Sequence, residues 1–256
     1  YTNSDSFHNE SLPTDLLSEI NNSIKIAEKN LLPTTAPIWD TISVGFAHSK
    51  GLMISGIYYD FFQHPDGSFS ILLIEPVNKG ADGIMYCAVA RGMVKSLISD
   101  KTPPQEVIPR LNYLLAEDTV HEGFYFTHIY FHTESDTLHY ISTDASPIWY
   151  CPSDKNSPVP LTLGAPLLGT SHSSKFAIQT RPWNQGNRLI ICSYTVKSEE
   201  PEVDREHIAN YLHKTLKEYL EQPPQAQING VLRRIKTSND KLLLLNSITL
   251  ISMQRN

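Results

Sequence analysis

Two consecutive helical stretches, placed between a β-hairpin and a long run of strands, constrain the fold of this 256-residue chain most. The hairpin is predicted from apolar strands at 52–63 and 68–77, joined by the turn His64-Pro65-Asp66-Gly67. The helical patterns cover 81–99 and 104–118. Further strands are predicted at 42–46, 124–133, 138–143, 147–151, 176–181, 188–194 and 242–253, and further helices at 203–220 and 226–235. This order predicts an α+β fold with mostly antiparallel sheets.

An amphipathic helix is predicted ahead of the strands. Its apolar residues recur at the three- and four-residue spacing of a heptad seam, at Leu17, Ile20, Ile24, Ala27 and Leu31. Pro33 ends this helix. Two heptads are too few for a stable free coiled coil, so two alternatives stay open. The helix is either the end of a longer signalling helix or a helix docked on its own domain.

The chain is expected to have two parts, a linker with its helix at 1–35 and one domain at 36–256. Residues 1–13 are polar and are predicted to be disordered or a linker remnant. Because the chain starts with Tyr1 rather than Met, we expect a fragment of a longer protein. No apolar run approaches the roughly 18 residues of a membrane span, and no signal peptide is visible. We therefore expect a cytoplasmic protein, which could be the cytoplasmic part of a larger sensor.

Charge and cysteine content narrow the class of protein. A formal net charge of −6 argues against a nucleic-acid-binding face, which would need to be basic. The densest basic cluster is predicted to be a solvated helix end, and consists of Arg233, Arg234 and Lys236. The three cysteines lack metal-ligand spacing and are expected to be inert thiols in a reducing compartment; they are Cys87, Cys151 and Cys192.

Several segments, in their order along the chain, resemble the SpoIIE/RsbU family of bacterial serine/threonine phosphatases, a branch of the metal-dependent type 2C superfamily. They include ISGIYYDFF, LLIEPVNKG, VIPRLNYLLAED, LHYISTDASPIWY, GAPLLG, LIICSYTVKSEE and NSITLISM. The resemblance implies a four-layer αββα sandwich with two Mn²⁺ or Mg²⁺ ions at one edge of the sheets. It also implies phosphoserine or phosphothreonine substrates on small STAS-domain anti-sigma-factor antagonists.

The chain departs from the family pattern where that pattern has its acids. The family's metal-binding aspartates align with Ile57, Glu75, Tyr194, Asn246 and Ser247. Of these, only Glu75 keeps a carboxylate, and the nearby Asp60 is not a principal ligand in the family pattern. A pair of hard cations needs several oxygen ligands, most of them carboxylates. The side chains of Ile, Tyr, Asn and Ser contain no carboxylate. We therefore expect no metal cofactor and no catalytic residues, although the family uses Mn²⁺ or Mg²⁺.

Some of the polar residues allow a catalytic, metal-binding or ligand-binding role as well as a purely structural one. Glu75 and Asp60 could form a general acid/base pair or hold one metal ion, but a surface hydrogen-bonding pair or a remnant of the old site is favoured. Four histidines are expected to be ordinary core or surface residues rather than a metal site: His121, His128, His132 and His139. The segment Asn78-Lys79-Gly80 is favoured as a plain helix start over a phosphate-binding corner. A small-molecule pocket lined by Ile57, Tyr58 and Tyr194 is a weaker alternative.

The sequence thus favours a pseudophosphatase with a regulatory binding role in a partner-switching pathway. Its expected partner is a STAS-domain antagonist, an anti-sigma kinase or a paralogous phosphatase, and the N-terminal helix could also pair two copies in a homodimer. The alternative is a divergent metal-dependent protein serine/threonine phosphatase acting on a phosphorylated STAS-domain protein.

Overall fold

Two antiparallel sheets form the centre of the molecule. The computed structural model describes residues 14–51, 56–117, 122–144, 147–196 and 201–256. One sheet has the strand order β1-β10-β9-β6-β7, formed by Ile42–Ser49, Ile248–Arg255, Arg188–Tyr194, Ile148–Cys151 and Val159–Pro160. The other has the order β2-β3-β4-β5-β8, formed by Tyr58–Gln63, Ser68–Pro76, Phe124–His132, Thr137–Ser142 and Gln179–Pro182. Every described strand pair is antiparallel.

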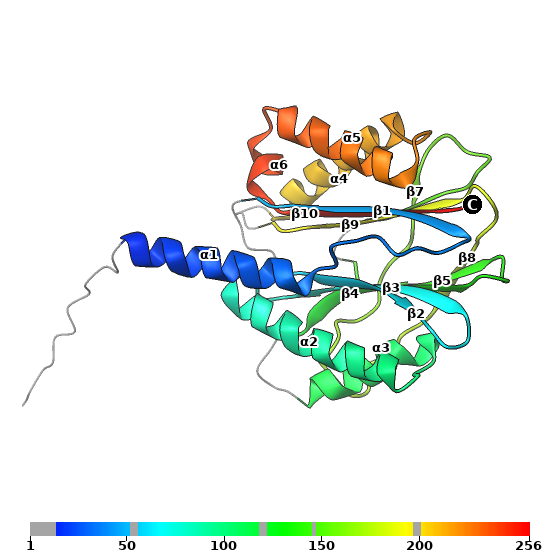
Figure 1. Cartoon of the computed structure of the whole chain (residues 1–256), viewed down its shortest axis with the longest axis horizontal. Helices are drawn as coiled ribbons and strands as arrows, with labels where there is room; N and C mark the ends of the chain where they lie inside the picture. The colour runs from blue at the N-terminus through cyan, green and yellow to red at the C-terminus, as the bar shows by residue number, and fades with distance from the viewer. Residues whose placement is uncertain (1–13, 52–55, 118–121, 145–146, 197–200) are drawn as a thin grey trace, which may run out of the picture.

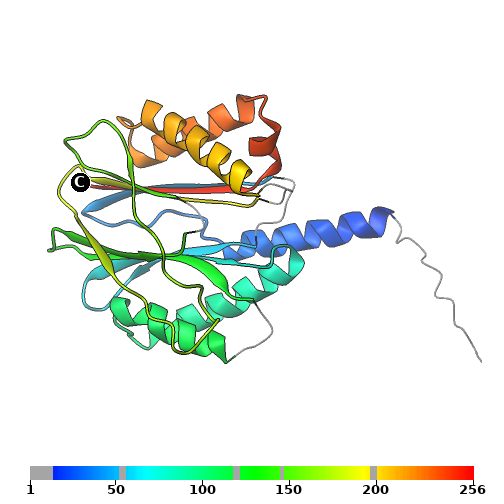
Figure 2. The ribbon, with the colours of Figure 1, turned by 180° about the vertical axis from the view of Figure 1, so that it is seen from behind.

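Helices cover the outer face of each sheet, which makes four layers in the order αββα (Figure 1). The β1–β10 sheet is covered by α4 (Pro201–Glu218) and α5 (Pro224–Thr237), with the short α6 (Lys241–Leu245) beside them. The β2–β3 sheet is covered by α2 (Ala81–Ser99) and α3 (Pro104–Ala116). The view from behind shows the same layers (Figure 2). This arrangement confirms the predicted α+β sandwich.

Three apolar cores hold the layers together. The inner core lies between the two sheets and includes Ile57, Tyr59 and Leu73. A second core lies between α2, α3 and the β2–β3 sheet, and a third lies between α4, α5 and the β1–β10 sheet. Because side chains alternate across a strand, neighbouring residues of one strand serve different cores. The face on which a residue lies therefore decides which partners it can meet.

The predicted turn and the helix at 81–99 are confirmed, whereas the predicted last strand at 242–253 is wrong at its start. The Asp240 side chain accepts hydrogen bonds from the backbone N–H groups of Leu242 and Leu243, and this cap starts the helical turn α6. The leucine run Leu242–Leu245 matches a strand by composition alone. The local cap decides its conformation, because it satisfies N–H groups that a strand would have to pair elsewhere.

Three further differences concern strand limits. The strand predicted at 52–63 is described only from Tyr58, and residues 52–55 lie outside the described part of the chain. The strand predicted at 176–181 is instead β8, Gln179–Pro182, which pairs with β5 at the edge of its sheet. The two-residue strand β7 has no signal in the sequence, because it forms only by pairing with β6. The prediction for residues 1–13 also lies outside the described residues.

The N-terminal helix α1 (Thr14–Leu31) lies beside α2 with its C-terminal half and extends away from the sandwich with its N-terminal half (Figure 1). Of the predicted heptad seam, Ile24 and Leu31 are half-buried, whereas Ile20 and Ala27 are exposed. The most buried described residue of the helix is Glu28, which is 2% exposed. The C-terminal half is thus a helix docked on its own domain. None of the described helices is long and apolar enough to cross a bilayer.

Gly45 of β1 allows α5 to approach the sheet closely. A Cβ at this position would overlap the backbone of Pro224 and Gln225 at the start of α5. We expect Gly45→Ala to lower the free energy of unfolding by about 1–3 kcal/mol, because overpacking forces backbone shifts. In the control Gly92→Ala, on α2, a Cβ meets no atom within 4 Å. That variant should be more stable by about 0.5–1 kcal/mol, since alanine favours a helix interior. Urea denaturation measures both changes, and equal effects would contradict this account.

Candidate functional site

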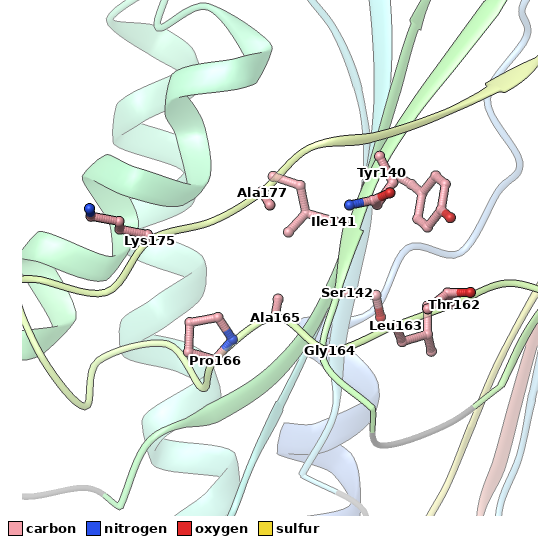
Figure 3. Close-up of a pocket in the computed structure, with 11 residues that line it drawn as sticks. Tyr140, Ile141, Ser142, Thr162, Leu163, Gly164, Ala165, Pro166, Lys175 and Ala177 are labelled. Atoms are coloured by element: carbon pink, nitrogen blue, oxygen red, sulfur yellow. The ribbon is translucent and has the colours of Figure 1, made fainter.

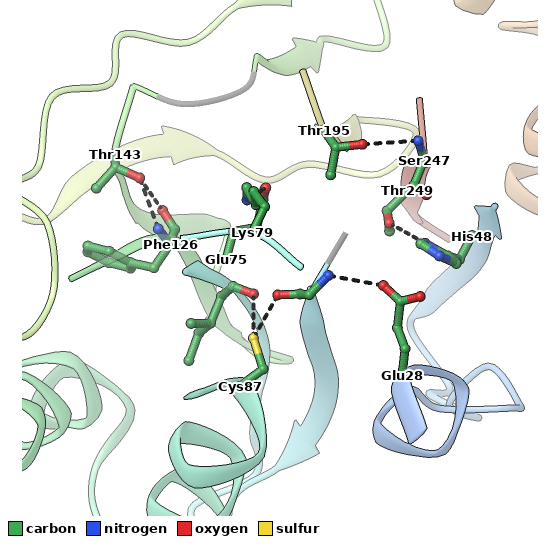
Figure 4. A network of polar contacts seen from close by, with 12 residues as sticks. Glu28, His48, Glu75, Lys79, Cys87, Phe126, Thr143, Thr195, Ser247 and Thr249 are labelled. Atoms are coloured by element: carbon green, nitrogen blue, oxygen red, sulfur yellow. Dashed lines mark hydrogen bonds and ion pairs between the residues drawn. The ribbon is translucent and has the colours of Figure 1, made fainter. Parts of the chain in front are cut away.

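The two residues predicted at the centre of the site, Ile57 and Glu75, belong to the sheet that contains β2 and β3. Ile57 directly precedes β2, is 1% exposed and packs in the inner core. Glu75 lies near the end of β3 and is 4% exposed. The Nζ atom of Lys79 lies 3.0 Å from the Oε2 atom of Glu75 (Figure 4). The one carboxylate retained at an expected ligand position is therefore already paired with a cation of the chain.

Tyr194 is turned into a different core from Ile57. Its ring is 3% exposed and packs in the core beneath α4 and α5. Its hydroxyl donates a hydrogen bond to the carbonyl oxygen of Arg205 at 3.1 Å. Burial raises the pKa of the Tyr194 hydroxyl, because the charged form would lose its hydration. Tyr194 thus stays a neutral group that packs against a helix.

Asn246 and Ser247 connect α6 to β10 through hydrogen bonds. The Asn246 side-chain amide donates to the Leu242 carbonyl oxygen at 2.8 Å, at the end of α6. The Ser247 backbone N–H donates to Thr195 Oγ1, and Ser247 Oγ accepts from the Gly51 N–H, both at 3.1 Å. These two residues join backbone segments where the family pattern has two acids.

The two residual acids lie on opposite faces of their sheet, which overturns the alternatives in which Glu75 and Asp60 act as a pair. Tyr59 and Leu73 point into the inner core, so by strand alternation Glu75 lies on the inner face and Asp60 on the outer face. Asp60 Oδ2 lies 2.5 Å from Lys95 Nζ. The same oxygen accepts a hydrogen bond from the Tyr58 hydroxyl at 3.1 Å. The two carboxylates therefore cannot share a metal ion or a proton.

The predicted small-molecule pocket lined by Ile57, Tyr58 and Tyr194 is also overturned. Ile57 packs in the inner core, Tyr58 in the core under α2 and α3, and Tyr194 in the core under α4 and α5. All three side chains are at most 3% exposed. Residues that serve three separate cores do not face a common space.

A layer of buried hydroxyl groups lies beside Glu75 at this end of the sandwich. Thr127 Oγ1 and Ser142 Oγ lie 2.7 Å apart across β4 and β5. Thr143 Oγ1 accepts from the Phe126 N–H at 2.9 Å, as the dashed lines in Figure 4 show. These residues are at most 6% exposed and satisfy one another, so they need no ion. Sequence reasoning missed them because single Ser and Thr residues in strands carry no distinctive signal.

Glu28 is a further residue that sequence reasoning missed. Its Oε1 accepts a hydrogen bond from the Gly56 N–H at 3.0 Å, directly before Ile57 (Figure 4). The Gly56 carbonyl in turn accepts from the Cys87 thiol at 2.9 Å, and Gly56 has a φ of 59°, which favours glycine. The sequence did contain a signal for this contact, because Glu28 lies on the same face of α1 as Ile24 and Leu31. Glu28 thus ties α1 to the segment that leads into β2.

The residues present do not fit a pair of divalent cations. The space beside Glu75, lined also by Thr127, Thr143 and Cys192, measures about 10 Å³. That is about the volume one water molecule needs. Two catalytic cations lie about 3.5–4 Å apart and share a bridging water. Within the described part of the chain, no group of three His, Cys, Asp or Glu side chains is placed to hold a metal ion.

The other candidates have structural roles. Lys79 pairs with Glu75, and Gly80, with a φ of 97°, directly precedes α2, so Asn78-Lys79-Gly80 forms a helix start. The three cysteines are free and buried, and burial raises the pKa of the Cys87 thiol. A pocket of about 210 Å³ beside β5 has Lys175 as its one charged lining residue in the described chain. Figure 3 places Lys175 and Tyr140 at opposite ends of that pocket, so no reactive groups converge there.

The histidines form no metal site among the described residues, and His121 lies outside them. His132 Nε2 contacts the Asp66 carbonyl oxygen at 2.7 Å, and the ring of His139 stacks on Tyr130. His128 is 1% exposed, and neither of its ring nitrogens has a hydrogen-bond partner within the described ranges. Burial, with a smaller contribution from His64, lowers the pKa of His128 to about 3. His128 therefore packs as a neutral ring.

Comparison with known proteins places these observations in context. The family model described as Stage II sporulation protein E (SpoIIE) matches residues 65–252. Among solved structures, the SiaA-PP2C domain of Pseudomonas aeruginosa matches with a TM-score of 0.71 and 12% identity, over 94% of this chain and 99% of that one. RsbX in complex with magnesium matches with a TM-score of 0.60 and 13% identity, over 87% and 99%. No curated protein matches the sequence.

A two-domain structure is matched in part. The RsbU and RsbW domains of a Mycobacterium tuberculosis protein match with a TM-score of 0.67 and 13% identity. The match covers 86% of this chain and 61% of that one, so this chain spans less than two thirds of its length. At these identities the likeness shows the fold alone, which is the PP2C phosphatase fold.

The neutral, unpartnered ring of His128 predicts acid-sensitive stability. The unfolded ring has a pKa near 6.5 and binds a proton more readily than the folded one, so its contribution is complete above pH 6.5 and is lost as the pH falls towards 3. This group alone should make the folded protein about 2 kcal/mol less stable at pH 5 than at pH 7.5. His128→Leu, which places an apolar chain opposite Leu72 and Ile141, should remove this part of the pH dependence. Urea denaturation at both pH values measures it, and an unchanged difference would count against the account.

Proposed function

The chain belongs to the SpoIIE (Stage II sporulation protein E) family, and on that premise we propose that it is a pseudophosphatase that acts by binding in a partner-switching pathway. Its phosphatase-type scaffold is complete in the described layers, whereas the expected ligand positions lack a converging set of carboxylates. The proposed role is to recognise a partner of that pathway without hydrolysing a phosphate.

The ion pair between Lys79 and Glu75 carries this proposal. A buried carboxylate needs a positive partner, and in a metal-dependent phosphatase the divalent ions supply it. In this chain the ammonium group of Lys79 does so at 3.0 Å. Ile57 fills the neighbouring position of the inner core and offers no ligand. A divalent cation would have to displace Lys79 and, at the expected ligand positions, would then meet the single carboxylate of Glu75.

The expected partners are those of partner-switching systems. The similar structures include RsbU and RsbW domains and one described under the bacterial stressosome, which supports a STAS-domain antagonist, an anti-sigma kinase or a paralogous phosphatase as the partner. We further propose that residues 1–35 connect the domain at 36–256 to a signal. The contact between Glu28 and Gly56 supports this role, because it ties α1 to the strand at the altered edge.

The first test measures metal binding and activity. We expect Mn²⁺ and Mg²⁺ to bind no more tightly than millimolar in calorimetry, and phosphoserine peptides and phosphorylated STAS-domain proteins to release no phosphate. An active PP2C domain such as that of SiaA, assayed beside it, validates the substrates. Turnover that Glu75→Ala abolishes would instead establish the alternative, a divergent metal-dependent phosphatase.

A second test restores the acid at position 57. Ile57→Asp should lower the free energy of unfolding by about 3–5 kcal/mol, because it places an unpaired charge in the inner core. The conservative control Ile57→Val should cost about 1 kcal/mol. Thermal unfolding with and without 5 mM MnCl₂ shows whether the new acid at position 57 binds a metal ion or stays an unpaired charge. Recovery of the melting temperature of Ile57→Asp by Mn²⁺ would reveal a metal cage that is otherwise intact and would oppose the proposal.

Partner binding is tested directly by titrating the chain with STAS-domain antagonists and anti-sigma kinases from one genome. We expect at least one to bind with micromolar or tighter affinity, and the Glu75→Gln variant to bind equally well because no catalysis is involved. Absence of binding to every component of such a pathway would contradict the proposed role.

A further inference from the structure

An open groove of about 660 Å³ lies where α1 ends, beside the edge strands β1 and β2 of the two sheets. Three parts of the chain contribute to it: the end of α1 with the segment after it, β1 with the residue that follows, and β2. The lining residues are Lys29, Leu32, Pro33, Thr34, Phe46, His48, Lys50 and Tyr59. Neither Ile57 nor Glu75 lines this groove, so binding in it is independent of the loss of phosphatase activity.

The groove combines an apolar interior with a basic rim. Tyr59 is 1% exposed, and Phe46, whose ring packs 5.9 Å from that of Tyr59, is half-buried. Lys29 and Lys50 are exposed, and no carboxylate is among the lining residues of the described chain. This differs from the protein as a whole, which carries a formal net charge of −6. The groove therefore complements an apolar group flanked by negative charge.

The half-buried imidazole of His48 lines the groove. Its Nδ1 lies 2.8 Å from Thr249 Oγ1, whereas its Nε2 is enclosed and has no hydrogen-bond partner among the described residues (Figure 4). The neighbouring carboxylate of Glu28 accepts a hydrogen bond from the Gly56 N–H instead. A buried polar atom without a partner costs free energy, which a ligand that reaches it recovers. His48 thus distinguishes the groove from a merely apolar depression.

Docking here would use side chains rather than strand addition. The Gln225 side-chain amide accepts from the Phe46 N–H at 3.1 Å and donates to the Phe46 carbonyl at 3.2 Å. It thereby pairs the outer edge of β1 as a neighbouring strand would. Beside Phe46 an occupant therefore meets the aromatic rings, the imidazole and the two ammonium groups, of which that of Lys50 also donates a hydrogen bond to the Lys25 carbonyl oxygen at 3.0 Å.

We propose that this groove binds a peptide segment of a partner protein in which an aromatic or aliphatic side chain is flanked by carboxylates. The apolar side chain packs against Phe46 and Tyr59. The carboxylates pair with Lys29 and Lys50, and a polar group of the segment reaches His48 Nε2 once the imidazole turns to expose it. Charge complementarity selects an acidic segment, and the open form of the groove accommodates a continuous chain.

The experiment begins with selection of phage-displayed random 12-residue peptides on the whole chain, followed by fluorescence anisotropy with the enriched peptide carrying fluorescein. We expect enrichment of Asp or Glu beside Leu, Phe, Tyr or Trp. Lys29→Gln combined with Lys50→Gln should weaken binding about tenfold, since both charge pairs lie at the rim. The exposed Lys214 on α4 provides the matched control, and Lys214→Gln should leave the affinity unchanged.

A third variant tests the interior of the groove separately from its charge. His48→Asn retains a polar atom near Thr249 but removes the Nε2 position, and should weaken binding by several-fold. Thermal unfolding confirms that each variant is folded. Raising the salt concentration from 50 to 300 mM should lower the affinity for the peptide, because salt screens the charge pairs.

Three outcomes would overturn the proposal. The first is enrichment of peptides without acidic residues, or of none at all. The second is an affinity that folded Lys29→Gln/Lys50→Gln protein retains in full. The third is displacement of the peptide by submillimolar phenylacetate, which would identify the occupant as a small carboxylic acid. None of these results bears on metal binding or phosphate release, so failure here is distinguishable from failure of the pseudophosphatase proposal.

Discussion

The packing of two antiparallel sheets face to face is the constraint on which the other features of this protein depend. The inner faces share one apolar core, and Ile57 belongs to it. An ionised acid at position 57 would need a cation beside it, because an apolar interior does not tolerate an unpaired charge. With isoleucine there, the core continues to the edge of the sandwich. The same layers that could support a metal-dependent enzyme are thus stabilised at this edge by packing.

The polar groups of that edge are satisfied from within the chain. Lys79 pairs with Glu75, and hydroxyl groups such as those of Thr127 and Ser142 bond to one another. The space left beside Glu75 measures about 10 Å³. These contacts are the basis of the proposal that this edge works without an ion. In the proposed pseudophosphatase, the fold would thus be stable without the metal-dependent phosphatase chemistry.

The first helix adds a contact that reaches the same edge. Glu28 accepts a hydrogen bond from the backbone directly before Ile57, and the end of α1 forms one wall of the basic, aromatic groove. A shift of α1 would therefore change both the segment leading into β2 and the width of the groove. The two proposed functions, recognition of a partner and connection to an upstream signal, meet at one helix.

The sequence by itself determined most of the elements, because period-two and period-3.6 patterns depend only on which residues avoid water. The layers followed from its resemblance to the SpoIIE/RsbU family. It also identified Ile57, Glu75, Tyr194 and Ser247 as positions without a converging set of acids. Only the tertiary structure decided that Asp60 lies on the face opposite Glu75, that α6 starts where a strand was predicted, and that Glu28 is buried. The position of Asp60 relative to Glu75 and the burial of Glu28 depend on contacts between residues far apart in the chain, which hydrophobic periodicity does not encode. The start of α6 depends on the Asp240 cap, a local signal that the leucine run outweighed in the prediction.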